Sequence, residues 1–86
     1  MTRAQCVQKL CQQLAGDVAA IAPSGIGRWP AAWDIVDAPS AELMIAITAW
    51  EATGSEEDRD KVRTWYNRVV AAWEEAGRAY EREVTR

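Results

Sequence analysis

Apolar residues recur at steps of three and four along most of the chain, the spacing that places side chains on one face of an α-helix. The first series runs through Val7, Leu10, Leu14 and Val18. It predicts an amphipathic helix over residues 2–22, whose first four residues have the spacing of a capping box. A Pro-Ser-Gly stretch follows directly and is expected to end this helix.

The middle of the chain is predicted to form two helices, a short one and a longer one. Pro30 suits the first position of a helix, so the short helix is expected over residues 31–36. Pro39 is expected to begin the longer helix, which ends at Gly54 because glycine readily adopts the left-handed conformation of a helix C-terminus. Its buried face is predicted to carry Leu43, Met44, Ile47 and Trp50, with Ile45 and Ala46 widening it.

The C-terminal third is predicted to form the longest helix, over residues 56–83, with Ser55 as its cap. At about 42 Å this helix is longer than the first helix, at about 30 Å, and the third, at about 22 Å. Its overhanging end is expected to meet the segment around Trp29 or to be covered by a second copy or a different protein. Its apolar residues alternate at steps of four and three, a heptad pattern: Val62, Tyr66, Val69, Trp73, Ala76 and Tyr80.

Together these elements predict an all-α fold, a small helical bundle of three long helices plus one short helix. A chain of 86 residues buries too little surface for two independent cores, so residues 1–86 are expected to form one helical domain. The predicted core consists of large apolar residues on the inward faces: Leu10, Leu14, Val18, Leu43, Ile47, Trp50, Trp65, Val69 and Trp73.

Ten basic and 13 acidic residues give a net charge of −3. This excess of acid disfavours binding to a polyanion, so nucleic acid is not an expected partner. The longest run of bulky apolar residues, 43–47, is far shorter than the roughly 20 residues that span a membrane. The sequence therefore predicts a cytoplasmic protein without a membrane partner.

The residue types needed for chemistry are scarce. Cys6 and Cys11 are about 8 Å apart on the predicted helix, too far for a disulfide. The chain has no histidine, the usual base near neutral pH and a common zinc ligand. Residues 24–27 contain Gly-x-Gly but lack the strand, the third glycine and the lysine of phosphate-binding loops. We therefore expect no enzymatic activity, no cofactor and no metal.

Candidate binding residues come from the least regular segment and from the acidic side chains. Trp29 and Trp33 lie near Arg28, and Trp and Arg are enriched in interface hot spots. Packing of both tryptophans in the core is the alternative. The acidic side chains would suit a basic partner surface, including one that normally holds nucleic acid. The candidate partner-binding residues are Arg28, Trp29, Trp33, Asp34, Asp37, Glu56, Glu57 and Asp58.

These features favour a small, non-catalytic protein-binding module with a protein partner. The alternative is a structural or assembly protein that self-associates through its C-terminal helix, for instance as a homodimer. A second alternative, a nucleic-acid-associated regulator, depends on the basic residues of that helix, although acidic residues alternate with them, as is typical of a solvated face. These basic residues are Arg59, Lys61, Arg63, Arg68, Arg78, Arg82 and Arg86.

In size, acidic charge and lack of catalytic residues, the chain resembles the small inhibitors encoded by phages and mobile elements, the anti-CRISPR proteins among them. The resemblance covers these general properties and no sequence motif, so it assigns no functional residue. It implies inhibition by occluding a surface of a bacterial defence complex.

Overall fold

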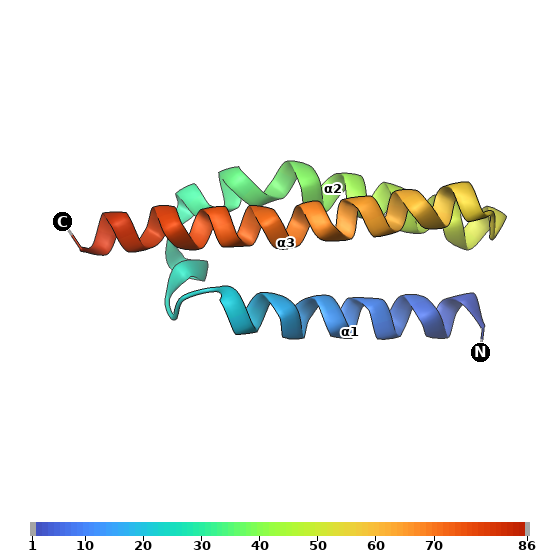
Figure 1. The fold of residues 1–86 in the computed structure, drawn as a ribbon, viewed down its shortest axis with the longest axis horizontal. Coiled ribbons are helices and arrows are strands. Elements are labelled where there is room, and N and C mark those ends of the chain that lie inside the picture. Colours follow the sequence, from blue (N-terminus) through green and yellow to red (C-terminus); the bar gives the residue numbers. More distant parts are fainter. Residues whose placement is uncertain (1, 86) are drawn as a thin grey trace.

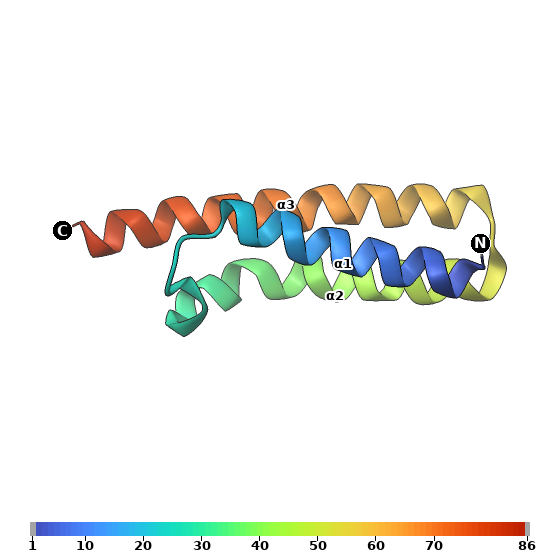
Figure 2. The same cartoon turned by 90° about the horizontal axis from the view of Figure 1, so that it is seen from below.

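A computed structural model describes residues 2–85, which form three long helices lying side by side (Figures 1 and 2). Helix α1 spans Arg3–Ile21, α2 spans Pro30–Thr53 and α3 spans Glu56–Val84. A 3₁₀ turn at Ile26–Arg28 lies between α1 and α2. Residues 2–85 contain no strand. The predicted all-α fold is therefore confirmed.

Polar caps fix the starts of α1 and α3, and both ends of these two helices lie within one residue of their predicted positions. Thr2 and Gln5 form the predicted capping box. The Thr2 hydroxyl accepts a hydrogen bond from the backbone N–H of Gln5 at 3.2 Å, and the Gln5 side chain accepts one from the N–H of Thr2 at 2.9 Å. At the start of α3, the Ser55 hydroxyl accepts the N–H of Asp58 at 3.2 Å. These bonds satisfy backbone donors that the first helical turn leaves unpaired.

The predicted break at Pro39 is wrong, because α2 runs through this residue without interruption. Pro39 leaves the backbone carbonyl of Ile35 without its usual helical donor, at a cost of about 3 kcal/mol. Val36 and Leu43 are both buried, and each contributes about 1.5–3 kcal/mol by leaving water. Burial on both sides of the proline therefore outweighs the lost bond. The short helix predicted over residues 31–36 is the start of α2, and the short element of the structure is the 3₁₀ turn.

The prediction of which residues form the buried face in the second half of α2 is also partly wrong. Leu43, Ala46 and Ile47 are buried as predicted, but Met44 and Ile45 are 60% and 63% exposed. Apolar residues occupy consecutive positions here, so spacing alone does not select which of them face the core.

α2 and α3 pack antiparallel and form the core of the bundle. Trp73 packs against both clusters of buried residues in this core. The heptad face predicted for α3 is confirmed, since all six of its members are buried or half-buried. The first cluster contains Ile26, Ala32, Val36, Ala72 and Ala76, and the second contains Leu43, Ala46, Ile47, Val62 and Val69.

α1 lies on the α2–α3 pair without burying any of its side chains completely. Val7 is half-buried against the second cluster, and the Tyr66 hydroxyl of α3 donates a hydrogen bond to the Asp17 carboxylate of α1. Of the predicted core, only Leu43, Ile47 and Val69 are fully buried. The other six predicted core residues are half-buried: Leu10, Leu14, Val18, Trp50, Trp65 and Trp73.

Replacing Pro39 with alanine is expected to stabilise the protein, because alanine supplies the backbone N–H that the carbonyl of Ile35 lacks. Proline also restricts the unfolded chain, and losing that restriction costs about 0.4–1 kcal/mol. A net gain of about 2 kcal/mol in the free energy of unfolding is therefore expected in urea denaturation.

Pro30→Ala is the matched control for this change. Pro30 is the first residue of α2, where no helical hydrogen bond is missing. Only the loss of chain restriction acts at this position, so the variant should be slightly less stable than the parent protein. A Pro39→Ala variant no more stable than Pro30→Ala would contradict the explanation.

The hydrogen bond between Tyr66 and Asp17 is expected to hold α1 in place. Burial of the ring, together with the bond to Asp17 and the charge of its carboxylate, raises the pKa of Tyr66 to about 12. This pKa lies above the ordinary value of 10.0. The stabilisation from neutral Tyr66 is therefore fully present below about pH 10 and is lost as the pH rises through about 12.

Tyr66→Phe tests this role because it removes the hydroxyl and keeps the ring. Amide hydrogens in α1 are expected to exchange faster in this variant, with little change in α2 and α3, since α1 opens locally more easily. Tyr80→Phe removes a hydroxyl near the other end of α3 and should leave exchange in α1 unchanged. Equal exchange rates for α1 in the two variants would show that the bond does not hold this helix.

Candidate protein-binding surface

The segment between α1 and α2 packs back onto the bundle and sets the position of Trp29. Gly25 has a φ of 88°, a left-handed conformation that favours glycine. The 3₁₀ turn follows, with Ile26 buried in the first cluster. Trp29 comes next and is half-buried, its ring centroid 5.7 Å from that of Tyr80. Trp29 therefore covers the C-terminal part of α3.

Trp33 is held by two contacts although 44% of its surface is exposed. Its indole Nε1 donates a hydrogen bond to the backbone carbonyl of Gly27 at 3.1 Å. Its ring meets that of Trp73 edge-on, with centroids 5.4 Å apart and ring planes at 84°. An exposed ring with a fixed orientation loses little conformational freedom when a partner covers it.

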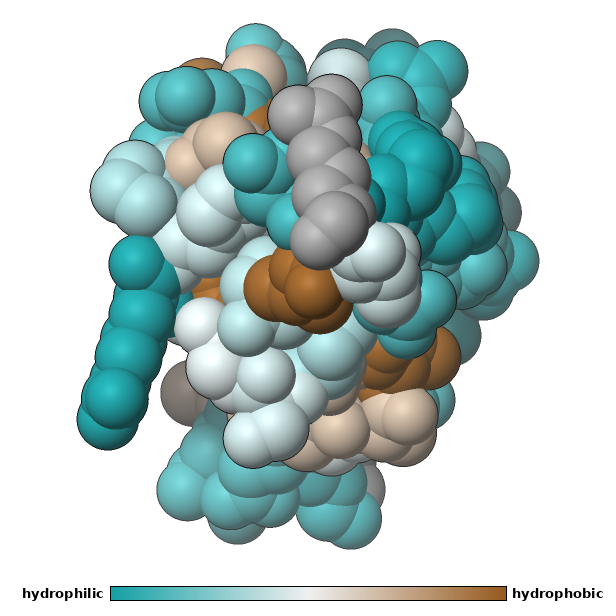
Figure 3. All heavy atoms as spheres, turned by 90° about the vertical axis from the view of Figure 1, so that its left-hand side faces the viewer, coloured by the Kyte–Doolittle hydropathy of each residue, from teal (hydrophilic) through white to brown (hydrophobic). Residues whose placement is uncertain are grey.

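The overhanging part of α3 meets the segment around Trp29, which is the first of the two predicted arrangements. Ala76 is buried in the first cluster, and Tyr80 packs against that cluster. Gly77 allows Pro23 to approach closely, since a Cβ at Gly77 would lie 3.2 Å from the Pro23 Cδ. Seen from this end, the surface is mainly hydrophilic, and its hydrophobic areas are small and separate (Figure 3).

The structure does not bring the predicted acidic residues together. Asp34 and Asp37 lie in the first turns of α2, whereas Glu56, Glu57 and Asp58 begin α3 at the opposite end of the bundle (Figure 1). The rest of α2 separates the two groups by about 24 Å. Only the first group adjoins the exposed tryptophan.

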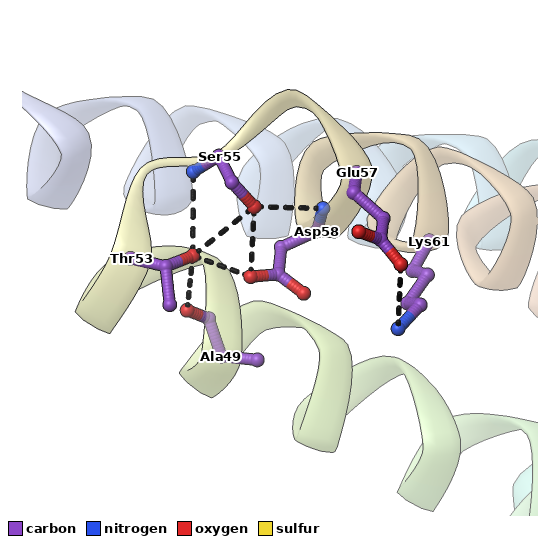
Figure 4. Close-up of polar contacts among 6 residues, drawn as sticks. All are labelled: Ala49, Thr53, Ser55, Glu57, Asp58 and Lys61. Carbon is purple, nitrogen blue, oxygen red and sulfur yellow. Dashed lines mark hydrogen bonds and ion pairs between the residues drawn. The ribbon is translucent and has the colours of Figure 1, made fainter.

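The acidic start of α3 makes its polar contacts within the chain's own turn. The Asp58 carboxylate accepts hydrogen bonds from the hydroxyls of Thr53 and Ser55, the latter at 2.9 Å (Figure 4). These bonds hold the pKa of Asp58 below its usual value of 3.8. Glu57 lies 3.9 Å from Lys61, one turn along α3. The Asp58 carboxylate therefore stabilises the connection between α2 and α3, whereas Glu57 pairs within the first turns of α3.

The basic candidate residues face different surroundings. Arg28 is exposed at the end of the 3₁₀ turn, beside Trp29 in the sequence. Arg59 and Arg63 line a groove of about 530 Å³ along α1 and α3. The Arg68 guanidinium lies over a tryptophan ring of α3, 4.6 Å from its centroid. These contacts divide the basic residues among several parts of the surface, and Arg86 lies outside the described residues.

The exposed surface continues along α2 from Trp33, which the spacing of the apolar residues does not predict. Met44 lies eleven residues further on, about three turns, and hence on the same side of the helix. The sequence of α2 does contain an indication of this surface, because its apolar side chains occur on all sides of the helix. A helix with this distribution is normally covered all round.

Within residues 2–85, no three side chains of the metal-binding types lie close enough together to hold an ion. No helix in this range combines the length and the apolar character needed to cross a lipid bilayer. No protein-family model matches the sequence, and neither the search of curated proteins nor the search of solved structures finds a match.

Proposed function

We propose that this protein acts by binding another protein, without catalysing a reaction, and that Trp33 lies at the centre of the contact surface. The observation that supports this proposal is the exposed but fixed ring of Trp33, held by the carbonyl of Gly27 and the ring of Trp73. Tryptophan is among the residues whose removal from an interface costs most binding energy. Asp34 and Asp37 supply polar groups at the rim of this surface.

We further propose that binding inhibits the partner by covering a functional surface of a larger complex, such as a bacterial defence complex. This hypothesis is supported by the resemblance to small phage-encoded inhibitors in size, charge and lack of catalytic residues. An inhibitor that acts by occupying a surface requires neither a nucleophile nor a cofactor. It requires a rigid contact residue and a small fold that presents it.

The two alternative functions have less support. Self-association through the C-terminal helix would need a free apolar face on α3, but α2 already packs along the heptad face. A nucleic-acid-binding role would need a continuous basic surface, whereas Arg68 stacks on Trp65 and Lys61 pairs with Glu57. Each alternative gives a distinct result in the experiment below.

The protein, used as bait in nuclease-treated bacterial lysate, is expected to retain a stoichiometric protein partner. Trp33→Ala should weaken the affinity for this purified partner about 30-fold or more, because removal of a hot-spot residue costs at least about 2 kcal/mol. Isothermal titration calorimetry measures the change. Circular dichroism establishes that the variant is folded.

Trp65→Ala is the matched control, because Trp65 is also an incompletely buried tryptophan but lies on α3 beside Arg68. This variant should be less stable and bind the partner as tightly as the parent. If Trp33→Ala binds the partner as tightly as the parent, the proposal is refuted. It is also refuted if Trp33→Ala does not fold while Trp33→Phe folds and binds with full affinity. Recovery of the bait alone at a mass above 9.6 kDa would indicate self-association. A partner that the bait retains from untreated lysate but loses after nuclease treatment would indicate nucleic acid.

A further inference from the structure

A groove runs between α1 and α2, and its lining is apolar. The two helices contact each other little, and the groove between them has a volume of about 440 Å³. The lining residues include Leu14, Ala15 and Val18 of α1 and Leu43, Met44 and Ile47 of α2. In a four-helix bundle, a further helix would occupy the position alongside these two.

The apolar surface continues from this groove over the outer side of α2. Met44 belongs both to the groove and to a shallow hollow that also contains Ile45, Ala49, Ala52 and one polar residue, Thr48. Met44 and Ile45 are each more than half exposed. Contiguous exposed apolar surface of this kind commonly marks a protein-binding site.

The charged residues of α2 are all acidic, and two of them lie beside the groove. Asp37 and Glu51 come seven residues before and after Met44, about two turns in each direction, so all three share one side of the helix. The residues that line the groove from α1 and α2 include no charged side chain. The rim on α2 therefore carries negative charge on both sides of an apolar centre.

A second copy of this chain that docks through its own α2 is a poor occupant for the groove. If two α2 helices paired antiparallel through Met44, Asp37 of one copy would face Glu51 of the other. If they paired in parallel, each acid would face its own equivalent. Like charges at facing positions destabilise a helix pair and suppress the wrong partner. Lysine or arginine at the facing positions would instead form favourable pairs.

We propose that this groove binds one amphipathic α-helix of a partner protein, with apolar residues that enter the groove and basic residues that face Asp37 and Glu51. The stretch between these two acids is about 21 Å long, which corresponds to about four turns of the partner helix. This inference rests on the proposed protein-binding function and names the element of the partner that is recognised. Trp33 lies on the same side of α2, so the groove and Trp33 form one continuous contact surface.

Two synthetic peptides of about 18 residues, roughly five helical turns, test the proposal. Both carry the same stripe of leucines, but one has lysine and arginine beside the stripe and the other has glutamate. The basic peptide is expected to bind, and the acidic peptide at least about tenfold more weakly, by calorimetry at low salt. The difference should shrink as salt screens the rim charges.

Charge reversal at the rim provides the sharper comparison. The double variant Asp37→Lys with Glu51→Lys is expected to prefer the acidic peptide. Glu74→Lys with Glu81→Lys is the matched control, because these acids are also exposed and seven residues apart but lie on α3, away from the groove. The control variant should keep the preference for the basic peptide.

Equal binding of the two peptides, or binding of neither, would overturn the proposal. A dimer in sedimentation that Met44→Glu dissociates would overturn it too, because the occupant would then be a second copy. Circular dichroism confirms that each variant is folded. The effect of Trp33→Ala on capture of a partner is measured in a separate experiment, so failure of this inference is distinguishable from failure of the proposed function.

Discussion

The antiparallel packing of α2 against α3 is the interaction on which the rest of the structure depends. Apart from Ile26, every fully buried side chain within residues 2–85 belongs to one of these two helices. Four of the buried residues are alanines, whose small side chains allow two helix axes to come close. The tight pair provides a rigid support for the other elements, and α1 rests on it through half-buried side chains.

This arrangement also explains why Trp33 is both exposed and fixed. Trp73 lies between the two clusters of the core, and its ring provides the surface against which Trp33 packs. The 3₁₀ turn is anchored by Ile26 and places the carbonyl of Gly27 within reach of the indole nitrogen of Trp33. The orientation of the candidate contact residue thus follows from the same packing that stabilises the fold.

The sequence predicts the features that depend on local chemistry. The caps at Thr2 and Ser55 lie where their side chains indicate, and the heptad pattern of α3 identifies one buried face. The interpretation of Pro39 fails because continuity of α2 depends on burial against α3, which local spacing does not contain. Residue type is enough to select Trp33 as a candidate, but its exposure depends on the position of Trp73. The acidic residues at the start of α2 and those at the start of α3 are far apart because the two helices pack antiparallel. The sequence around either group does not contain this information.

α3 is the last of the three helices in the chain, yet both of the others pack mainly against it. During synthesis, α1 and α2 therefore leave the ribosome with their apolar faces uncovered. Asp17 and Tyr66 are 49 positions apart and meet only after much of α3 has been made. Exposed apolar surface on incomplete chains favours aggregation and capture by chaperones. The bundle of α1, α2 and α3 can therefore close only after α3 has been made.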